Sequence, residues 1–159
     1  THRLLLFPEN WQLSQRNAPC TASACIRILD HYGIDCTGKK AVIVGRSLVV
    51  GKPVSMMLLK KNATITVCHT KTKNIKQEVQ AADIVVAAAG SAGFIKKEHL
   101  RTGQVVIDVG IHRNAENKLC GDVDFDSVEP ICSAITPVPG GVGPMTIAML
   151  MNNCVSSVE

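Results

Sequence analysis

The strongest constraint on the fold is a series of short apolar runs, rich in β-branched residues, that recur between stretches with helical spacing. The runs are Lys40–Val44, Thr64–Cys68, Ile84–Ala88 and Val105–Asp108, with Ser133–Thr136 as a fifth candidate. Strands that alternate with helices pair in parallel, because a parallel pair needs a crossover connection. The sequence therefore predicts an α/β fold with a parallel sheet at its centre.

The stretches between these runs indicate helices and one hairpin. The predicted helices follow Thr21, Pro53, Asn74 and Gly143. Gly33 stands where the first helix would end, and Pro144 stands in the first turn of the last one. A small hairpin is predicted around Asn117. With helices on both faces, the expected architecture is a Rossmann-like, doubly wound parallel sheet with flanking helices.

The composition is that of one folded domain, and it excludes several classes of protein. Hydrophobic residues make up 46% of the 159 residues, charged residues 19% and aromatic residues 3%. The net charge of +4 comes from scattered Lys and Arg, so we expect no nucleic-acid partner. No apolar run has the length of a membrane span, and the seven cysteines include no CxxC pair. We expect no membrane partner, free thiols and a cytoplasmic location.

The loop after the first predicted strand resembles a phosphate-binding turn in composition. In a parallel sheet the carboxyl ends of the strands meet at one edge, where ligands bind. Gly45 allows the chain to turn sharply off the strand, and Gly51 allows a phosphate or the sheet to approach the backbone. The segment from Gly45 to Pro53 lacks the full GxGxxG pattern, so a turn without a ligand is the alternative.

The end of the second predicted strand favours NADP over NAD as the cofactor. Enzymes that use NAD place an acidic residue there to bind the ribose hydroxyls. Here the strand is followed by His69, Thr70, Lys71 and Thr72, with no acid in reach. Arg46, with Thr70 and Lys71, would instead surround a 2′-phosphate through charge-assisted hydrogen bonds. The alternative is that Arg46 and Lys71 are solvated surface charges.

The loops after the third and fourth strands contain small residues. The segment 87–91, with Gly90, leaves room for an extended ligand, although small residues also serve close helix packing. Asp108 ends the fourth strand, and Gly110 follows it. We interpret Asp108 as a turn or cap residue rather than as an acid catalyst.

The most informative segment is Ile135–Thr146, which reads ITPVPGGVGPMT. Its prolines stiffen the backbone, while Gly140 and Gly141 permit positive φ angles. The segment feeds directly into the last helix, whose N-terminus can face an anion. The residues alone therefore predict a nucleotide or anion site at this edge of the sheet.

This segment also resembles the signature of the methylenetetrahydrofolate dehydrogenase/methenyltetrahydrofolate cyclohydrolase family. Further motifs resemble the same family in the same order: Gly45–Ser47 with Val50–Pro53, His69 with Thr72, Ala82–Val85, Val106–Ile111 and Gly121–Phe125. The resemblance implies that residues 19–159 form the NAD(P)-binding domain of such an enzyme. It further implies that residues 1–18 are an irregular lead-in left from a missing N-terminal catalytic domain.

The resemblance implies a reaction and a set of contacts. The reaction is NADP-dependent oxidation of 5,10-methylenetetrahydrofolate to 5,10-methenyltetrahydrofolate, followed by hydrolysis to 10-formyltetrahydrofolate. It belongs to one-carbon metabolism and purine biosynthesis. The expected cofactor contacts are Gly45, Arg46, Ser47, Gly51, Pro53, Thr70, Gly90, Ile111 and Thr146. The expected tetrahydrofolate contacts are Pro139, Gly140, Gly141, Val142 and Gly143.

The catalytic groups of the family are expected outside this sequence. In the family they lie in motifs of the preceding domain that are absent here, and Tyr32 cannot be matched to them. We therefore assign no catalytic residue and no metal ligand. Met145, Met149 and Val155 are expected to be partly uncovered, which favours a homodimer. Two alternatives stay open: an isolated dinucleotide-binding module with little or no turnover, and a Rossmann-like oxidoreductase acting on another substrate.

Overall fold

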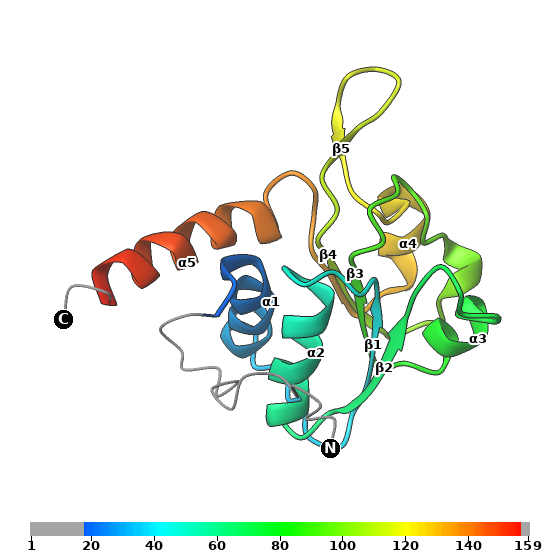
Figure 1. The fold of residues 1–159 in the computed structure, drawn as a ribbon. Helices are drawn as coiled ribbons and strands as arrows, with labels where there is room; N and C mark the ends of the chain where they lie inside the picture. Colours follow the sequence, from blue (N-terminus) through cyan, green and yellow to red (C-terminus); the bar gives the residue numbers. More distant parts are fainter. Residues whose placement is uncertain (1–17, 157–159) are drawn as a thin grey trace, which may run out of the picture.

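The computed structural model describes residues 18–156 and contains a five-stranded sheet whose neighbouring strands are all parallel (Figure 1). The strand order is β2-β1-β3-β4-β7. The bounds are β1 Lys40–Val44, β2 Thr64–Cys68, β3 Ile84–Ala87, β4 Val105–Asp108 and β7 Ala134–Ile135. The predicted Rossmann-like α/β fold is confirmed. The predicted lead-in lies, apart from Ala18, outside the described residues.

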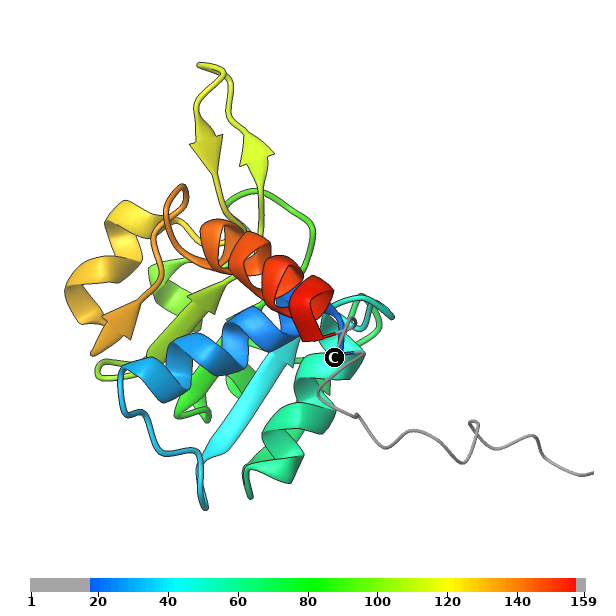
Figure 2. The same cartoon turned by 90° about the vertical axis from the view of Figure 1, so that its left-hand side faces the viewer.

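Helices cover both faces of this sheet (Figures 1 and 2). One face packs against α1 Cys20–His31, α2 Gly51–Lys60 and α5 Val142–Ser156. The opposite face packs against α3 Ile75–Gln80, α4 Phe125–Val128 and the 3-10 helix η2 Glu129–Ile131, while the 3-10 helix η1 Lys97–His99 contacts α3. None of the helices in residues 18–156 combines the length and apolar character that crossing a bilayer requires.

The central strands β1, β3 and β4 are mostly apolar because both of their faces are buried. Ala41 and Ile43 of β1 point into the core under α1, α2 and α5, whereas Val42 and Val44 point into the opposite core. Side chains alternate between the faces of a strand, so a strand covered on both sides reads as a continuous hydrophobic run. This is why the runs in the sequence located the strands.

The order of the strands reverses between β1 and β3. The chain passes from β1 to β2 on one side, and then returns to place β3 on the other side of β1. Val44, at the end of β1, is paired with both Cys68 and Ala87. Ligands of doubly wound sheets bind at the carboxyl ends of the strands at such a switch point. The fold therefore directs attention to the loops that follow Val44, Ala87 and Asp108.

Some element bounds differ from the sequence-based expectation. β3 ends at Ala87, and β7 contains only Ala134 and Ile135. The last helix was expected to begin after Gly143, but α5 begins at Val142. The earlier start is possible because amides in the first turn have no partner within the helix, so Gly143 and Pro144 cost little there. The predicted hairpin is confirmed.

The hairpin projects away from the sheet as a separate arm (Figures 1 and 2). It consists of β5 His112–Arg113 and β6 Leu119–Cys120, which pair in antiparallel orientation. Asn117 lies in its turn with a φ angle of 61°, a left-handed conformation that asparagine tolerates. The base of the hairpin begins only a few residues after β4, so it borders the carboxyl edge of the sheet.

Candidate functional site

The loops after β1 and β3 touch at the switch point, and glycine makes this contact possible. A Cβ atom on Gly45 would lie 2.7 Å from the carbonyl carbon of Ala88 and still closer to its oxygen. The φ angle of Gly45 is 128°, and its N–H donates to the carbonyl of Cys68 at 2.9 Å. A Cβ on Gly51 would lie 2.7 Å from the carbonyl carbon of Gly45. Both glycines therefore allow close backbone packing.

Ser47 caps the start of α2 from within the chain. Its Oγ accepts hydrogen bonds from the N–H groups of Val50 at 3.1 Å and Gly51 at 3.3 Å. The N–H of Lys52 donates to the Ser47 carbonyl at 3.0 Å, and Pro53, which is buried, has no N–H. The chain thus uses the first amides of this helix for itself. Recognition of an anion here would rest on the Arg46 side chain and the Ser47 hydroxyl.

The Ser47 hydroxyl keeps a proton to donate. A hydroxyl group has two acceptor lone pairs and one donor hydrogen. Since the amides of Val50 and Gly51 occupy both lone pairs, the hydrogen is directed to another partner. Ser47 and Arg46 are both exposed, so this hydrogen and the guanidinium are available to a phosphate at the same loop.

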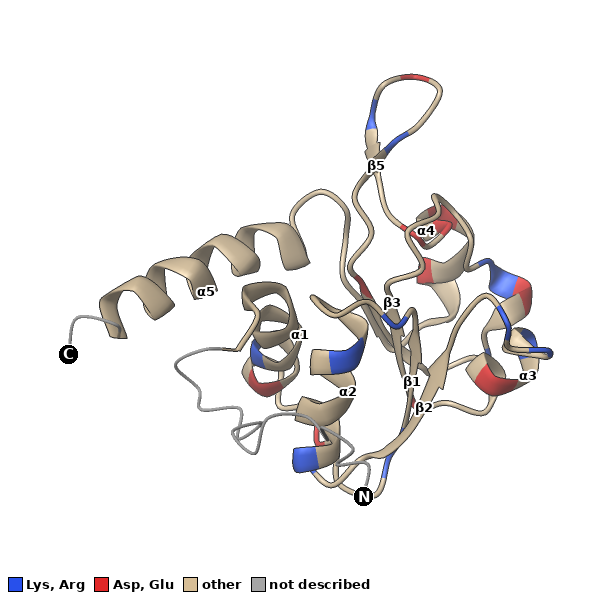
Figure 3. Cartoon of the chain, in the orientation of Figure 1, with Lys and Arg blue, Asp and Glu red and all other residues tan. Residues whose placement is uncertain are grey.

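Arg46 and Thr70 leave adjacent strands at the same edge. Val44 is paired with Cys68, and each of the two residues comes two positions after its strand. Thr70 is exposed in a turn that is closed by a hydrogen bond from the N–H of Thr72 to the carbonyl of His69 at 2.8 Å. The two loops contain basic but no acidic residues (Figure 3). This edge therefore presents positive charge and hydroxyl groups next to the ends of β1 and β2.

A cavity of about 600 Å³ lies further along the same edge, over the end of β4. It is lined by Ile111, Thr146 and all five predicted tetrahydrofolate contacts, Pro139 to Gly143. Val50, from the loop after β1, lines it too, so the two most informative segments of the sequence converge. Ile111 is 63% exposed, which leaves its side chain open to a ligand in this cavity.

The loop before α5 has one fixed shape that glycine permits. Gly140 has a φ angle of 105°, and the peptide bond between Val138 and Pro139 is cis. A Cβ atom on Gly141 would lie 2.5 Å from the carbonyl oxygen of Pro137. A side chain is therefore excluded at Gly141, and an L residue would be strained at Gly140.

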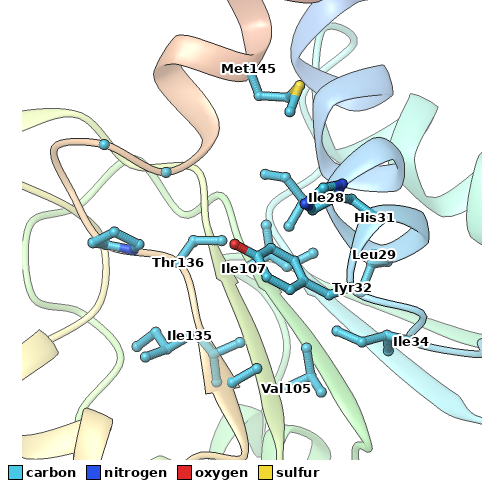
Figure 4. Close-up of a pocket in the computed structure, with 15 residues that line it drawn as sticks. Ile28, Leu29, His31, Tyr32, Ile34, Val105, Ile107, Ile135, Thr136 and Met145 are labelled. Atoms are coloured by element: carbon cyan, nitrogen blue, oxygen red, sulfur yellow. The ribbon is translucent and has the colours of Figure 1, made fainter.

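A second cavity, of about 470 Å³, lies on the other side of this loop and was not predicted from the sequence (Figure 4). It runs between α1 and the edge formed by β4 and β7. Its lining includes Ile28, Tyr32, Ile135 and Met145. Tyr32 is 72% exposed at its mouth. Periodicity did not indicate this groove, because its walls come from elements far apart in the chain.

Two buried aspartates border the site and were not assigned a functional role from the sequence. Asp108 accepts hydrogen bonds from the N–H groups of Gly110, Asp122 and Val123 at 2.9, 3.0 and 2.9 Å. The interpretation of Asp108 as a turn residue is thus confirmed, and burial raises its pKa despite these bonds. Asp122 accepts the N–H of Gly90 at 3.0 Å. The predicted cofactor contact at Gly90 would therefore involve its Cα or carbonyl.

The carboxyl edge of the sheet has two distinct parts. A basic, hydroxyl-bearing end lies over β1 and β2, and a largely apolar cavity lies over β4 and the start of α5. An elongated ligand with an anionic end fits both parts together. These features define a dinucleotide-binding α/β domain.

The comparison with known families gives the particular family. Residues 19–159 match the NAD(P)-binding domain of tetrahydrofolate dehydrogenase/cyclohydrolase. The chain belongs to this family, as its motifs predicted.

Individual relatives agree with this assignment. The chain is similar to the bifunctional protein FolD of Agathobacter rectalis, with 59% identity over 141 residues, which are 89% of this chain and 50% of that protein. The solved FolD methylenetetrahydrofolate dehydrogenase/cyclohydrolase of Campylobacter jejuni has 48% identity and a TM-score of 0.86, over 87% of this chain and 49% of that one.

A third relative carries a cofactor. The Trypanosoma brucei enzyme, complexed with NADP cofactor and inhibitor, has 41% identity and a TM-score of 0.82, over 88% of this chain and 50% of that one. This chain spans about half the length of these relatives. The predicted family and fold are confirmed, whereas the contacts assigned to single residues stay predictions.

Proposed function

We propose that this chain binds NADP and forms the cofactor half of a methylenetetrahydrofolate dehydrogenase/cyclohydrolase. The reaction would be oxidation of 5,10-methylenetetrahydrofolate to the 5,10-methenyl form and its hydrolysis to 10-formyltetrahydrofolate. The observation that carries the proposal is the meeting of the loop after β1 with the loop before α5 around one cavity, in a chain of this family.

The preference for NADP over NAD rests on the basic end of the site. The guanidinium of Arg46 and the hydroxyls of Ser47 and Thr70 offer charge and hydrogen-bond donors to a 2′-phosphate. An acidic residue, which would repel that phosphate, is absent from the loops 45–50 and 69–74. The Trypanosoma brucei relative was solved with NADP, which agrees with this preference.

Some of the remaining predicted contact residues shape the site, and others line the cavity where a ligand would touch them. Gly51 and Pro53 are buried and set the position of α2, whereas Ile111 and Thr146 line the cavity beside the proposed folate contacts at Pro139–Gly143. The chemistry that NADP supplies when bound is acceptance of a hydride. The residues of this chain would orient the nicotinamide and exclude water from the cavity.

Catalysis by the chain alone is not part of the proposal. Asp108 is the titratable side chain among the residues that line the cavity, and its carboxylate is occupied by three backbone N–H groups. It is therefore not placed to exchange protons with a substrate. The second candidate function, a dinucleotide-binding module with little or no turnover, is favoured by this observation.

One experiment tests the function and separates the two candidates. NADP and NAD are titrated into the purified chain by calorimetry. Dehydrogenase and cyclohydrolase activities are then measured with and without an added N-terminal half from a relative. We expect NADP to bind more tightly than NAD, and activity to require the added half. Activity of the chain alone would exclude the module, and absence of NADP binding would refute both candidates.

We also propose a cytoplasmic location and a homodimer. The seven cysteines are all free, which suits a reducing compartment. Met145 and Met149 are half-buried against the core, while Ile147, Met151 and Val155 are 61%, 67% and 61% exposed on α5. Such an apolar surface favours association. Light scattering that shows a monomer over a wide concentration range would contradict the homodimer.

A further inference from the structure

Asp122 is a charged residue without any solvent exposure, and three donors converge on its carboxylate. The N–H of Gly90 donates to Oδ2 at 3.0 Å, and the N–H of Ser91 donates to Oδ1 at 3.0 Å. Nε2 of His112 lies 2.7 Å from the same Oδ1. Because an ionised carboxylate only accepts hydrogen bonds, this nitrogen carries the proton. Asp122 thus joins the loop after β3 to the base of the hairpin.

Two glycines leave room for the carboxylates of Asp108 and Asp122. A Cβ atom on Gly110 would lie 2.5 Å from Oδ1 of Asp122. A Cβ on Gly121 would lie 2.7 Å from Oδ1 of Asp108, which accepts the N–H of Asp122. Each aspartate therefore packs against a glycine of the opposite segment. The motifs Val106–Ile111 and Gly121–Phe125 together form one structural unit that holds the carboxylate of Asp122.

The segment that Asp122 holds lies at the switch point. Ala88 contacts Gly45 of the loop after β1, and Gly90 and Ser91 follow it in the chain. Both Gly90 and Ser91 are exposed, and the space beside the Gly90 Cα is open. Their N–H groups point inward to Asp122, so the outer face of the loop is what a ligand would meet. The position of that face is set by the buried carboxylate.

We propose that Asp122 is a positioning residue for the dinucleotide, and that His112 supports it from the hairpin. This inference rests on the proposed NADP site. Asp122 holds the loop 90–91 in the conformation that accepts the middle of the cofactor, between the phosphate end over β1 and β2 and the cavity over β4. Asp122 does not touch the ligand, because no part of it is exposed.

Two other roles for the cluster fail on its geometry. A catalytic acid or base must reach the substrate, but Asp122 is covered, and its carboxylate is already hydrogen-bonded to three groups of the protein. A metal site would need a group of ligands facing one point, and residues 18–156 contain no group of three or more His, Cys, Asp or Glu in such an arrangement. The hydrogen bonds of Asp122 lead to the loop 90–91, to the hairpin, to Asp108 and, through its backbone carbonyl, to the N–H of Ile95.

The first test is Asp122→Asn, which keeps the size of the side chain. The amide offers one acceptor oxygen, and its NH₂ group would face a backbone N–H, so one of the loop bonds is lost. If the loop then holds its binding conformation about a tenth of the time, the Kd for NADP rises about tenfold. Adenosine 2′,5′-bisphosphate, which would contact only the end at Arg46 and Thr70, should bind with unchanged Kd.

The matched control is Asp83→Asn at the opposite end of β3. Asp83 also accepts a backbone N–H, from Lys40 at 2.9 Å, and pairs with Arg101 at 2.8 Å. Its replacement should lower the melting temperature without changing the Kd for NADP. A Kd that rises equally in both variants, or for both ligands of Asp122→Asn, would show a general loss of stability and overturn the positioning role.

His112 provides a second pair of variants in case Asp122→Asn does not fold. His112→Ala removes one donor from Asp122 and should raise the Kd for NADP about threefold, by lowering the population of the binding conformation. His112→Gln returns a donor and should restore it. Hydrogen exchange at the amides of Gly90 and Ser91 should accelerate in His112→Ala but not in His112→Gln. Unchanged exchange and affinity in His112→Ala would refute the inference, while absence of NADP binding to the unmodified chain would refute the proposed function instead.

Discussion

The contact between the loops after β1 and β3 predicts that Gly45→Ala is strongly destabilising. The added Cβ would lie 2.7 Å from the carbonyl carbon of Ala88, at a backbone φ of 128°. Neither segment can withdraw freely. The N–H of Gly45 donates to Cys68 at 2.9 Å, and the N–H of Ala88 donates to Val44 at 2.8 Å. Relief of the clash would therefore break the ends of three strands.

Two costs contribute to the expected loss of stability. Overpacking in a tightly packed region costs about 1–3 kcal/mol, and a side chain in a backbone region that favours glycine costs about 1–3 kcal/mol. The sum for Gly45→Ala is about 2–6 kcal/mol, a large part of a typical total of roughly 5–15 kcal/mol. Gly33→Ala is the matched control, because Gly33 has a φ of 64° but nothing within 4 Å of its added Cβ. Gly33→Ala should therefore lose only the free energy that comes from a side chain at a positive φ angle.

Urea unfolding, followed by far-ultraviolet circular dichroism, measures both variants. The free energies of unfolding come from linear extrapolation. We expect Gly45→Ala to lose at least about 1 kcal/mol more than Gly33→Ala, because overpacking is added to the backbone cost. If the two variants lose the same free energy, the close approach of Gly45 and Ala88 does not exist in solution, and the reasoning is refuted.

Three further predictions follow from single residues. Arg46→Ala should raise the Kd for NADP by about tenfold or more while the Kd for NAD changes little, since a hydrogen bond to a charged group contributes about 1.5–3 kcal/mol. Arg113→Ala on the hairpin is the control. An equal loss of affinity for both cofactors would contradict the role of Arg46. The backbone bond from Lys40, aided by Arg101, lowers the pKa of Asp83. Its contribution to stability is present above the unfolded pKa of about 3.9 and disappears as the pH falls through the lower folded pKa. Asp83→Asn should thus be less stable than the unmodified chain at neutral pH, with a gap that closes in acid; a gap independent of pH in urea titrations would be the contrary result. Burial raises the pKa of Cys25 to about 12, whereas Cys154 is exposed. Iodoacetamide, read by mass spectrometry, should label Cys154 in the folded chain and Cys25 only after unfolding.

The strands were predictable because β-branched runs leave a local signature, which burial on both faces strengthens in β1, β3 and β4. β1, β2 and β4 have the bounds that their β-branched runs indicated, and Asn117 located the hairpin turn. The start of α5 was misplaced by two residue positions because Gly143 was interpreted as lying before the helix. Glycine is tolerated in the first turn of a helix, so Gly143 does not prevent an earlier start. The packing of Val142 into the core places the start of α5 at Val142.

The candidate site was predictable only as a set of loops at one edge. The sequence indicated that Gly45 and Gly51 allow close approach, but it did not show whether the neighbour is a ligand or the chain itself. The structure shows backbone neighbours for both. Asp122 escaped prediction because its partners, Gly90, Ser91 and His112, lie on two other loops. No periodicity in a single sequence encodes such a contact.

The most direct test of the central claim is a two-dimensional amide NMR spectrum recorded while NADP is added to the labelled chain. A cofactor that lies across the carboxyl ends of the strands should shift the amides of Arg46, Ser47, Thr70 and Gly141, and each shift should saturate with one Kd. Shifts confined to the opposite edge, around Lys40 and Asp83, or no saturable shifts at all, would contradict the account.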